Sequence, residues 1–323
     1  MTLCRFDIEP SLTFPVMLVL EGLYVLIARH LRSDHNDRNR PVTGGGIIFI
    51  IAVWLFALSE PSDIFPEQFG YITGCATVLA IVSFIDDMRP LSPLLRLGIQ
   101  IVTITVPLIM VPDMTMSWIA YILLIFLGVA FVNAYNFMDG INGMTVAYSV
   151  VTLLAIGYCS EIVFPLPNVV TSLSMILLST TAAIGFLNFR RHEIVHCGDA
   201  GSIVMGFLIL YLISSLIYAT DDWSYIALIF VYGVDTGYTA LYRLLHGENI
   251  LKGHKLHLYQ LLDSRKHVPH LYISTAYAIV QAVIDIGLIL TPSPYRAWYA
   301  AGSFVLLMAL YSTVRYRISH TAI

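Results

Sequence analysis

Two adjacent aspartates, Asp86 and Asp87, stand where the apolar run "TVLAIVSFI" ends. Carboxylates at the C-terminal end of a helix lie next to the negative end of its dipole, so they need a compensating cation. Magnesium is commonly held by one or two such carboxylates together with substrate phosphates. The pair therefore indicates a site for a divalent metal ion. The alternative for an isolated pair is a solvated helix end.

Four polar residues follow at intervals of three along the next part of the sequence, namely Asn133, Asn136, Asp139 and Asn142. On a helix this spacing places them on roughly one face. Asparagines in membrane helices often form hydrogen bonds between helices, which is the alternative for each one alone. Four such groups within ten residues favour a site instead.

A third acidic motif, "GDAGS" at 198–202, surrounds Asp199 with small residues just before another apolar run. Small neighbours leave the carboxylate accessible, and the N-terminus of a helix attracts phosphate. The motif suits a phosphate and its metal ion. An aspartate that merely caps the helix is the alternative.

The segment "KGHKLHLYQ" at 252–260 brings His254, Lys255 and His257 close together in the sequence. Zinc would need a third ligand, and none is spaced for it. A cationic pocket for phosphate is the better interpretation. Asp235 lies within a nearby apolar run, where an acid is a functional candidate, and we expect it to pair with Arg243 or Lys252.

These motifs belong to a chain whose composition is that of a membrane protein. Of its 323 residues, 58% are hydrophobic and only 12% are charged, about half the roughly 25% of soluble domains. We expect one all-α transmembrane domain over 1–323 with about 10–11 transmembrane helices. Apolar segments fall at 11–29, 44–58, 69–85, 94–111, 117–137, 141–158, 168–187, 201–219, 223–245, 270–290 and 296–314. The second and third are expected to be short.

The basic residues fix the expected orientation. If the N-terminus is periplasmic, all of the 17 lysines and arginines except Arg5 and Arg296 fall at cytoplasmic ends of the segments. The outer connections carry acids instead, as in "SEPSDIFPE" and "TDDW". All the motifs above, and "TGGG" at 43–46, then lie on the cytoplasmic face. Five segments are expected to converge there on one active site.

Clustered acids, amides and cations at a membrane surface suggest metal-assisted chemistry between a soluble phosphorylated molecule and a lipid. In this order and spacing, "DD", "NAYNFMDGING", "GDAGS" and "GHKLHLYQ" resemble the polyprenyl-phosphate N-acetylhexosamine-1-phosphate transferases. The resemblance runs from Thr43 to Gln260. It is strongest to the O-antigen-initiating branch, which is related to the phospho-MurNAc-pentapeptide translocase.

The resemblance implies transfer of a sugar-1-phosphate from a UDP-N-acetylhexosamine to undecaprenyl phosphate in the bacterial inner membrane, with release of UMP. It implies Mg²⁺, or Mn²⁺, as cofactor, no nucleic-acid partner, and a possible homodimer. Asp199 would bind the metal with help from Asn136, while Asp86 and Asp87 would act near the lipid phosphate as proton acceptor or further metal contacts. The substrate-binding residues would be Asn133, Asp139, Asn142, Asn188, His254, Lys255 and His257.

The sequence departs from the family pattern in places. The usual apolar "IFMGD" is replaced by "IVHCGD", which introduces His196, and Asn142 replaces an acid. Two other classes of membrane protein would show different features. A secondary transporter would place its acids near the bilayer midplane and show two related halves. A CDP-alcohol-type phosphotransferase would carry an "AR" that "MDGINGMTV" lacks.

Overall fold

The computed structural model describes residues 10–31, 40–59, 69–110, 116–165, 168–249 and 254–320. Within these ranges the regular structure is helical, apart from one isolated bridge between Val42 and Val195. The helices are α1 (Pro10–Leu31), η2 (Gly45–Ile47), α2 (Ile48–Ser59), α3 (Phe69–Met88), α4 (Pro93–Ile109), α5 (Trp118–Met138), α6 (Met144–Val163), α7 (Val169–Asn188), α8 (Gly198–Thr220), η3 (Trp223–Ile229), α9 (Phe230–Leu245), α10 (Leu258–Lys266), α11 (His270–Leu290), η4 (Ser293–Tyr295) and α12 (Arg296–His320). The all-α prediction is confirmed.

Each of the predicted apolar segments forms a helix. Among the described residues, eight helices are long and apolar enough to cross a membrane by themselves. The second segment is short, as expected, since the apolar helix there covers only Gly45–Ser59. The third is not short, because α3 extends over Phe69–Met88; the other short helix is α4, Pro93–Ile109. The segment at 223–245 is divided into η3 and α9.

Side-chain caps mark where several of these helices begin. Ser92 accepts a hydrogen bond from the backbone N–H of Leu95 at the start of α4, 3.2 Å away. Asn168 accepts one from Thr171 at the start of α7, at 2.8 Å. Such caps satisfy backbone donors that the first turn of a helix leaves unpaired.

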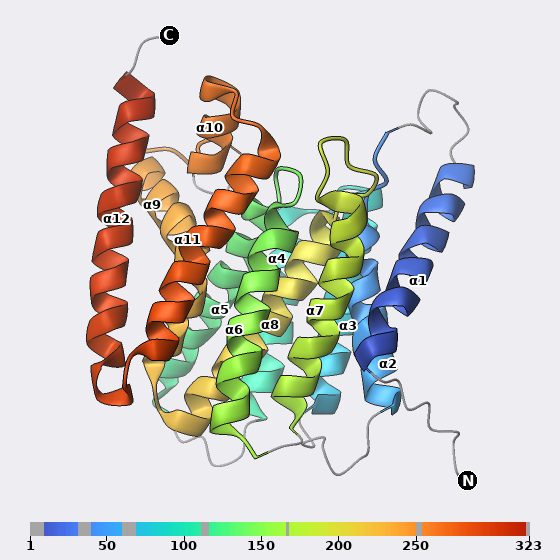
Figure 1. Ribbon diagram of the computed structural model, residues 1–323, viewed down its shortest axis with the longest axis horizontal. Coiled ribbons are helices and arrows are strands. Elements are labelled where there is room, and N and C mark those ends of the chain that lie inside the picture. The colour runs from blue at the N-terminus through green and yellow to red at the C-terminus, as the bar shows by residue number, and fades with distance from the viewer. Residues whose placement is uncertain are drawn as a thin grey trace.

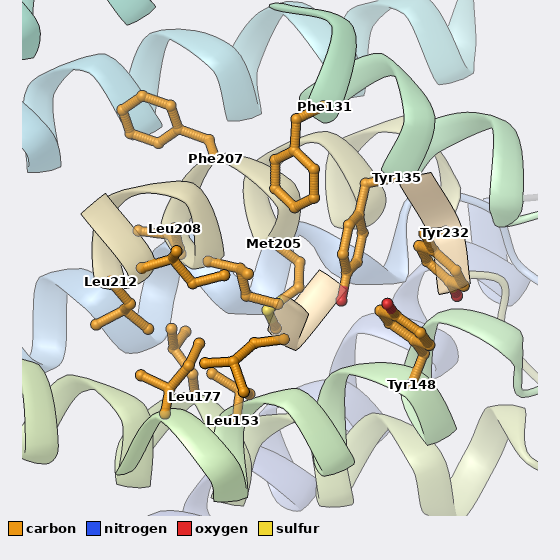
Figure 2. Packing of buried hydrophobic residues seen from close by; sticks show 14 of the residues in the cluster. Phe131, Tyr135, Tyr148, Leu153, Leu177, Met205, Phe207, Leu208, Leu212 and Tyr232 are labelled. Carbon is orange, nitrogen blue, oxygen red and sulfur yellow. The ribbon is translucent and has the colours of Figure 1, made fainter. Parts of the chain in front are cut away.

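The long helices run side by side as a bundle, with α8 at its centre (Figure 1). Most of the α8 side chains are buried, and they pack against α3, α5 and α6. Figure 2 shows part of this core, where the rings of Tyr148 and Tyr232 stack with centroids 3.6 Å apart and Tyr135 meets them edge-on. The core therefore fixes α8, whose first turn carries the "GDAGS" motif.

The connections that carry the polar motifs lie at one end of the bundle. In Figure 1 this is the upper end, where α1, α7, α9 and α12 finish and where α10 lies. The connections from α3 to α4, from α5 to α6 and from α7 to α8 also lie there, because their helices alternate in direction. The predicted convergence of these segments on one end is thus observed. Residues 32–39 and 250–253 lie outside the described residues.

Candidate active site

The first turn of α8 is held by Asp87 from the end of α3. The Oδ1 atom of Asp87 accepts a hydrogen bond from the backbone N–H of Asp199 at 2.9 Å, and Oδ2 accepts one from Ala200 at 3.1 Å. Gly198 adopts φ +71°, and a Cβ there would lie 2.6 Å from Asp87 Oδ2. Only glycine fits this position. The positive end of the α8 dipole supplies part of the compensating charge that was expected beside Asp87.

The other compensating charge comes from Arg96, in the first part of α4. Its Nη1 atom forms an ion pair with Asp86 Oδ2 and another with Asp199 Oδ2, the latter at 3.1 Å. Asp86 also accepts a hydrogen bond from the backbone N–H of Leu91 at 2.6 Å. In the sequence, Arg96 is only one of the basic residues that predict the membrane orientation. No sequence pattern indicates that its position on α4 directs it toward the acids.

Asn136 joins the same cluster from the end of α5. Its Nδ2 atom donates to Asp199 Oδ1 at 2.7 Å and to the Ser202 hydroxyl at 3.1 Å. In this orientation Asn136 binds Asp199 through its amide nitrogen. The amide group of Asn136 would have to rotate before its oxygen could bind a metal ion. The side chain of Asp199 is 28% exposed, against 9% for Asp86. Asp199 is therefore the more accessible of these two carboxylates.

Asn133 and Asp139, two other members of the predicted polar stripe, make no hydrogen bond to these acids. Asn133 donates to Gln100 Oε1 of α4 at 2.6 Å and to the Val129 carbonyl at 2.8 Å. This is the hydrogen bonding between helices that was the alternative for a lone asparagine. Asp139 follows α5 and accepts a hydrogen bond from the Thr145 hydroxyl. Burial raises the pKa of Asp139 to about 7, so near neutral pH it is only partly ionised.

Asn142 and Asn188 tie connections together. Asn142 donates to the Arg190 carbonyl at 3.0 Å and lies 2.9 Å from Nδ1 of His270 on α11. Asn188 Oδ1 accepts from the Gly143 N–H at 2.9 Å, while its Nδ2 donates to the Val195 carbonyl at 2.8 Å. Both side chains are buried. Their geometry indicates that they shape the rim of the site, whereas a direct substrate contact remains a prediction.

The "TGGG" segment closes another side of the site. The N–H groups of Gly45 and Gly46 donate to the carbonyls of His196 and Cys197 at 3.1 and 3.0 Å. A Cβ on Gly46 would lie 2.0 Å from the Gly201 Cα. Only a residue without a side chain allows this approach between η2 and α8.

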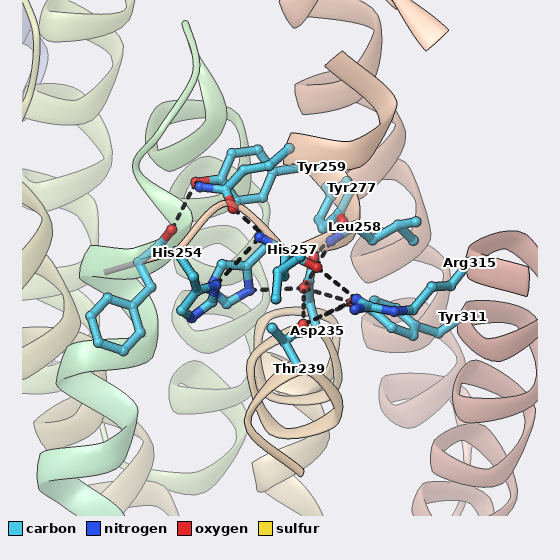
Figure 3. A network of polar contacts seen from close by, with 12 residues as sticks. Asp235, Thr239, His254, His257, Leu258, Tyr259, Tyr277, Tyr311 and Arg315 are labelled. Atoms are coloured by element: carbon cyan, nitrogen blue, oxygen red, sulfur yellow. Dashed lines mark hydrogen bonds and ion pairs between the residues drawn. The ribbon is translucent and has the colours of Figure 1, made fainter. Parts of the chain in front are cut away.

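The His-rich segment is anchored on α9, α11 and α12 by a buried carboxylate (Figure 3). Asp235 Oδ1 lies 3.0 Å from His257 Nδ1 and accepts from the Leu258 N–H at 3.2 Å. The hydroxyl groups of Tyr277 and Tyr311 donate to the same carboxylate at 2.6 and 2.9 Å. His257 is thus a buried anchor of this segment.

The expected pairing of Asp235 with Arg243 is wrong. Arg243 instead pairs with Glu248, at 2.9 Å, and Asp235 pairs with His257. Lys252 lies outside the described residues. The reason is that the "HLYQ" segment lies against α9. His257 therefore contacts Asp235, whereas Arg243, near the end of α9, contacts Glu248.

The idea of a wholly cationic pocket also needs correction. Burial lowers the pKa of His254 to about 4, so its ring is neutral at pH 7. Lys255 is exposed. Tyr259 donates its hydroxyl to the Phe137 carbonyl at 2.8 Å and packs against Gly140. These contacts place the segment beside the end of α5, next to the acid cluster.

Comparison with known proteins shows which family part of the chain resembles. The sequence pattern described as "Glycosyl transferase family 4" matches residues 69–217. The family 4 match runs from α3 to α8, so it contains every member of the acid cluster, while the His-rich segment lies beyond it.

Named relatives agree with the family 4 match. Over 70% of its length the chain is 30% identical to the "Probable undecaprenyl-phosphate N-acetylglucosaminyl 1-phosphate transferase" of Bacillus subtilis, covering 66% of that protein. It is 27% identical over 62% of its length to the "Undecaprenyl-phosphate alpha-N-acetylglucosaminyl 1-phosphate transferase" of Salmonella typhi, covering 59%. It is 25% identical over 58% of its length to the "Phospho-N-acetylmuramoyl-pentapeptide-transferase" of Dictyoglomus thermophilum, covering 63%. The chain thus spans 59% to 66% of these relatives.

Phosphotransferases of the family 4 type generally use a divalent metal ion, and the residues present fit one. Asp86 and Asp199 come from different helices and already share one positive group, the Arg96 guanidinium. Within the described ranges, no three His, Cys, Asp or Glu side chains are grouped so that they could hold a metal ion by themselves. The remaining ligands would therefore come from water and substrate phosphates, as is usual for magnesium.

Proposed function

We propose that this chain transfers an N-acetylhexosamine-1-phosphate from a UDP-sugar to undecaprenyl phosphate and releases UMP. The observation that carries the proposal is the convergence of Asp86, Asp87, Asp199 and Asn136 with Arg96 at one end of a membrane bundle. The family match supports it, because the matched residues contain the whole cluster. The product would be a polyprenyl diphosphate sugar, the first intermediate of a lipid-linked surface polysaccharide.

The reaction needs charge stabilisation more than proton transfer. An oxygen of the lipid phosphate attacks the donor phosphorus that carries the sugar, and a new P–O bond forms. The bond from that phosphorus to the bridging oxygen breaks, and this oxygen leaves with its electron pair as part of UMP. A phosphate monoester has a second pKa of about 6, so the acceptor is already largely dianionic at pH 7. A strong general base is not required.

The residues divide these tasks. Asp86 and Asp199 would hold Mg²⁺, or Mn²⁺, which when bound neutralises the negative charge of the donor diphosphate. Arg96 has a side chain that is 33% exposed, so its guanidinium can contact a phosphate as well as the two carboxylates. Asp87 uses both oxygens on the α8 backbone, and its role is to fix the position of Asp199.

The orientation of the protein is part of the proposal. The positive-inside rule places the end that carries the basic connections in the cytoplasm, and the N-terminus in the periplasm. UDP-sugars are cytoplasmic metabolites, so the active site would meet its soluble substrate on that side. The protein would reside in the bacterial inner membrane.

Release of UMP tests the proposal. Purified protein in detergent would be given UDP-GlcNAc, and UMP would be measured with undecaprenyl phosphate or Mg²⁺ omitted in turn. We expect UMP only when both are present. A panel of UDP-GlcNAc, UDP-GalNAc, UDP-FucNAc and UDP-QuiNAc would then identify the sugar. UMP release without lipid, or release of CMP from a CDP-alcohol instead, would contradict the proposal.

A further inference from the structure

The connection between α7 and α8 contains a histidine held in one orientation by a buried carboxylate. His196 Nδ1 lies 2.9 Å from Glu193 Oε1. The Glu193 side chain is only 9% exposed, whereas that of His196 is 43% exposed. The other Glu193 oxygen accepts a hydrogen bond from Asn188 Nδ2 at 2.9 Å. Asn188 thus fixes the glutamate, and the glutamate fixes the imidazole.

This arrangement determines which ring nitrogen is available. A carboxylate beside Nδ1 accepts the proton of that nitrogen and so selects the tautomer. Within the described part of the chain, Nε2 of His196 has no hydrogen-bond partner. The backbone on either side is also fixed, because the His196 N–H donates to the Val42 carbonyl at 2.8 Å and its carbonyl accepts from Gly45. The imidazole ring is therefore held in one orientation, and its Nε2 atom is available to bind a ligand.

The titratable groups that act most strongly on the charge of His196 are carboxyl groups. They are Glu193 in its own connection, Asp87 at the end of α3 and Asp139 at the end of α5, which is only partly ionised near neutral pH. A substrate phosphate entering this end of the bundle meets these acids as well as Asp86 and Asp199. Arg96 is the cation already paired within the acid cluster. Another positive group at the rim would offset the repulsion between the acids and an incoming phosphate.

We propose that His196, oriented by Glu193, binds a substrate phosphate through its Nε2 atom during the transfer reaction. The inference rests on the proposed function and extends it to a residue outside the acid cluster. The phosphate belongs either to the UDP-sugar or to the lipid acceptor, and the two share the same chemistry at this position. The hydrogen bond that His196 donates to Glu193 raises the pKa of His196, which favours the charged ring that a phosphate requires.

Substitution of His196 tests this role. His196→Gln keeps a hydrogen-bond donor for Glu193 but cannot carry a positive charge. We expect kcat/KM for one of the two substrates to fall about tenfold or more, the range for a lost hydrogen bond to a charged group. A change confined to the UDP-sugar assigns the donor phosphates, and one confined to the lipid assigns the acceptor phosphate. The matched control is His192→Gln, an exposed histidine of the same connection, which should stay within about twofold of wild type.

The pH profile separates phosphate binding from a merely structural role. Because the charged ring is the active form, kcat/KM of wild type should decline as pH rises through the raised pKa of His196. Glu193→Gln removes the charge that raises this pKa, so the decline should move to lower pH. An unshifted profile for Glu193→Gln would overturn the inference. So would wild-type kinetics for His196→Gln, or a lower kcat with both KM values unchanged.

Direct binding keeps this test independent of turnover. Calorimetric Kd values for UDP-GlcNAc and for a short-chain polyprenyl phosphate would be compared between wild type and His196→Gln at pH 6.5. Weaker binding of one of them by the variant supports the inference, and equal binding of both contradicts it. Wild type that binds these ligands but releases no UMP would contradict the proposed function and leave the His196 result standing.

Discussion

Asp199 is the residue on which the proposed chemistry depends most. It shares Arg96 with Asp86, accepts a hydrogen bond from Asn136, and is more exposed than Asp86. Asp199→Asn should lower turnover at least about a hundredfold, because an amide cannot supply the charge that a magnesium site needs. Thermal stability should change little, since the Asp87 contacts are with the Asp199 backbone. UMP release at several Mg²⁺ concentrations and a melting curve check this prediction.

A matched control lies at the opposite end of α8. Asp221 is exposed and adopts φ 53°, a conformation that asparagine tolerates. Asp221→Asn removes the same charge from the same protein and should leave turnover unchanged. Near-normal activity of Asp199→Asn at low Mg²⁺ would show that the metal assignment is wrong.

The neutral ring of His254 leads to a second prediction at this scale. With its pKa lowered to about 4, His254 carries no charge between pH 5.5 and 8. His254→Gln should therefore keep more activity than His254→Arg, because the position holds an uncharged, partly buried ring and a guanidinium there would lose part of its hydration. The measurement is kcat/KM for the UDP-sugar. The reverse order of the two variants would restore the cationic pocket inferred from the sequence.

At the scale of elements, the site depends on how α3 meets α8. Asp87→Asn leaves one oxygen to accept a hydrogen bond and turns an N–H₂ group toward a backbone donor. We expect a loss of about 1–2 kcal/mol in stability, comparable to the loss of a helix cap, together with reduced activity. Asp199→Asn should also lose activity, but without this loss of stability.

Thermal unfolding of the two variants, measured side by side with UMP release, checks this contrast. Equal melting temperatures for wild type and Asp87→Asn would argue that Asp87 does not hold α8, and that its carboxylate acts on the substrate instead.

The sequence predicted the elements better than their contacts. Apolar segments are readable because a membrane helix must satisfy its own backbone and present an apolar surface. The acids were found because charge is conspicuous in such segments. Arg96 and Asp87 could not be assigned their partners, since their contacts with Asp199 span 103 and 112 positions. Asn133 resembled a site residue because an amide in a helix–helix contact has the same sequence pattern as one at a binding site.

At the scale of the whole molecule, the distribution of basic residues predicts the orientation. Single cysteines would be placed at exposed positions in a background without other reactive thiols: Ser293→Cys in the connection after α11, and Arg191→Cys and Lys255→Cys at the other end. A membrane-impermeant thiol reagent applied to intact cells should label only Ser293→Cys. Labelling of Lys255→Cys from outside would reverse the proposed topology. The acidic segment around Asp63 lies outside the described residues.

The central claim is that the sugar moves together with its phosphate. Donor labelled with ³²P at the phosphate that carries the sugar distinguishes this reaction from a simple glycosyl transfer. Purified protein would be incubated with this UDP-GlcNAc, undecaprenyl phosphate and Mg²⁺, and the label would be followed into the lipid and aqueous phases. We predict that the label enters the lipid, with one UMP released for each labelled lipid formed. Label that stays in the aqueous phase as UDP, with unlabelled sugar on the lipid, would contradict the account.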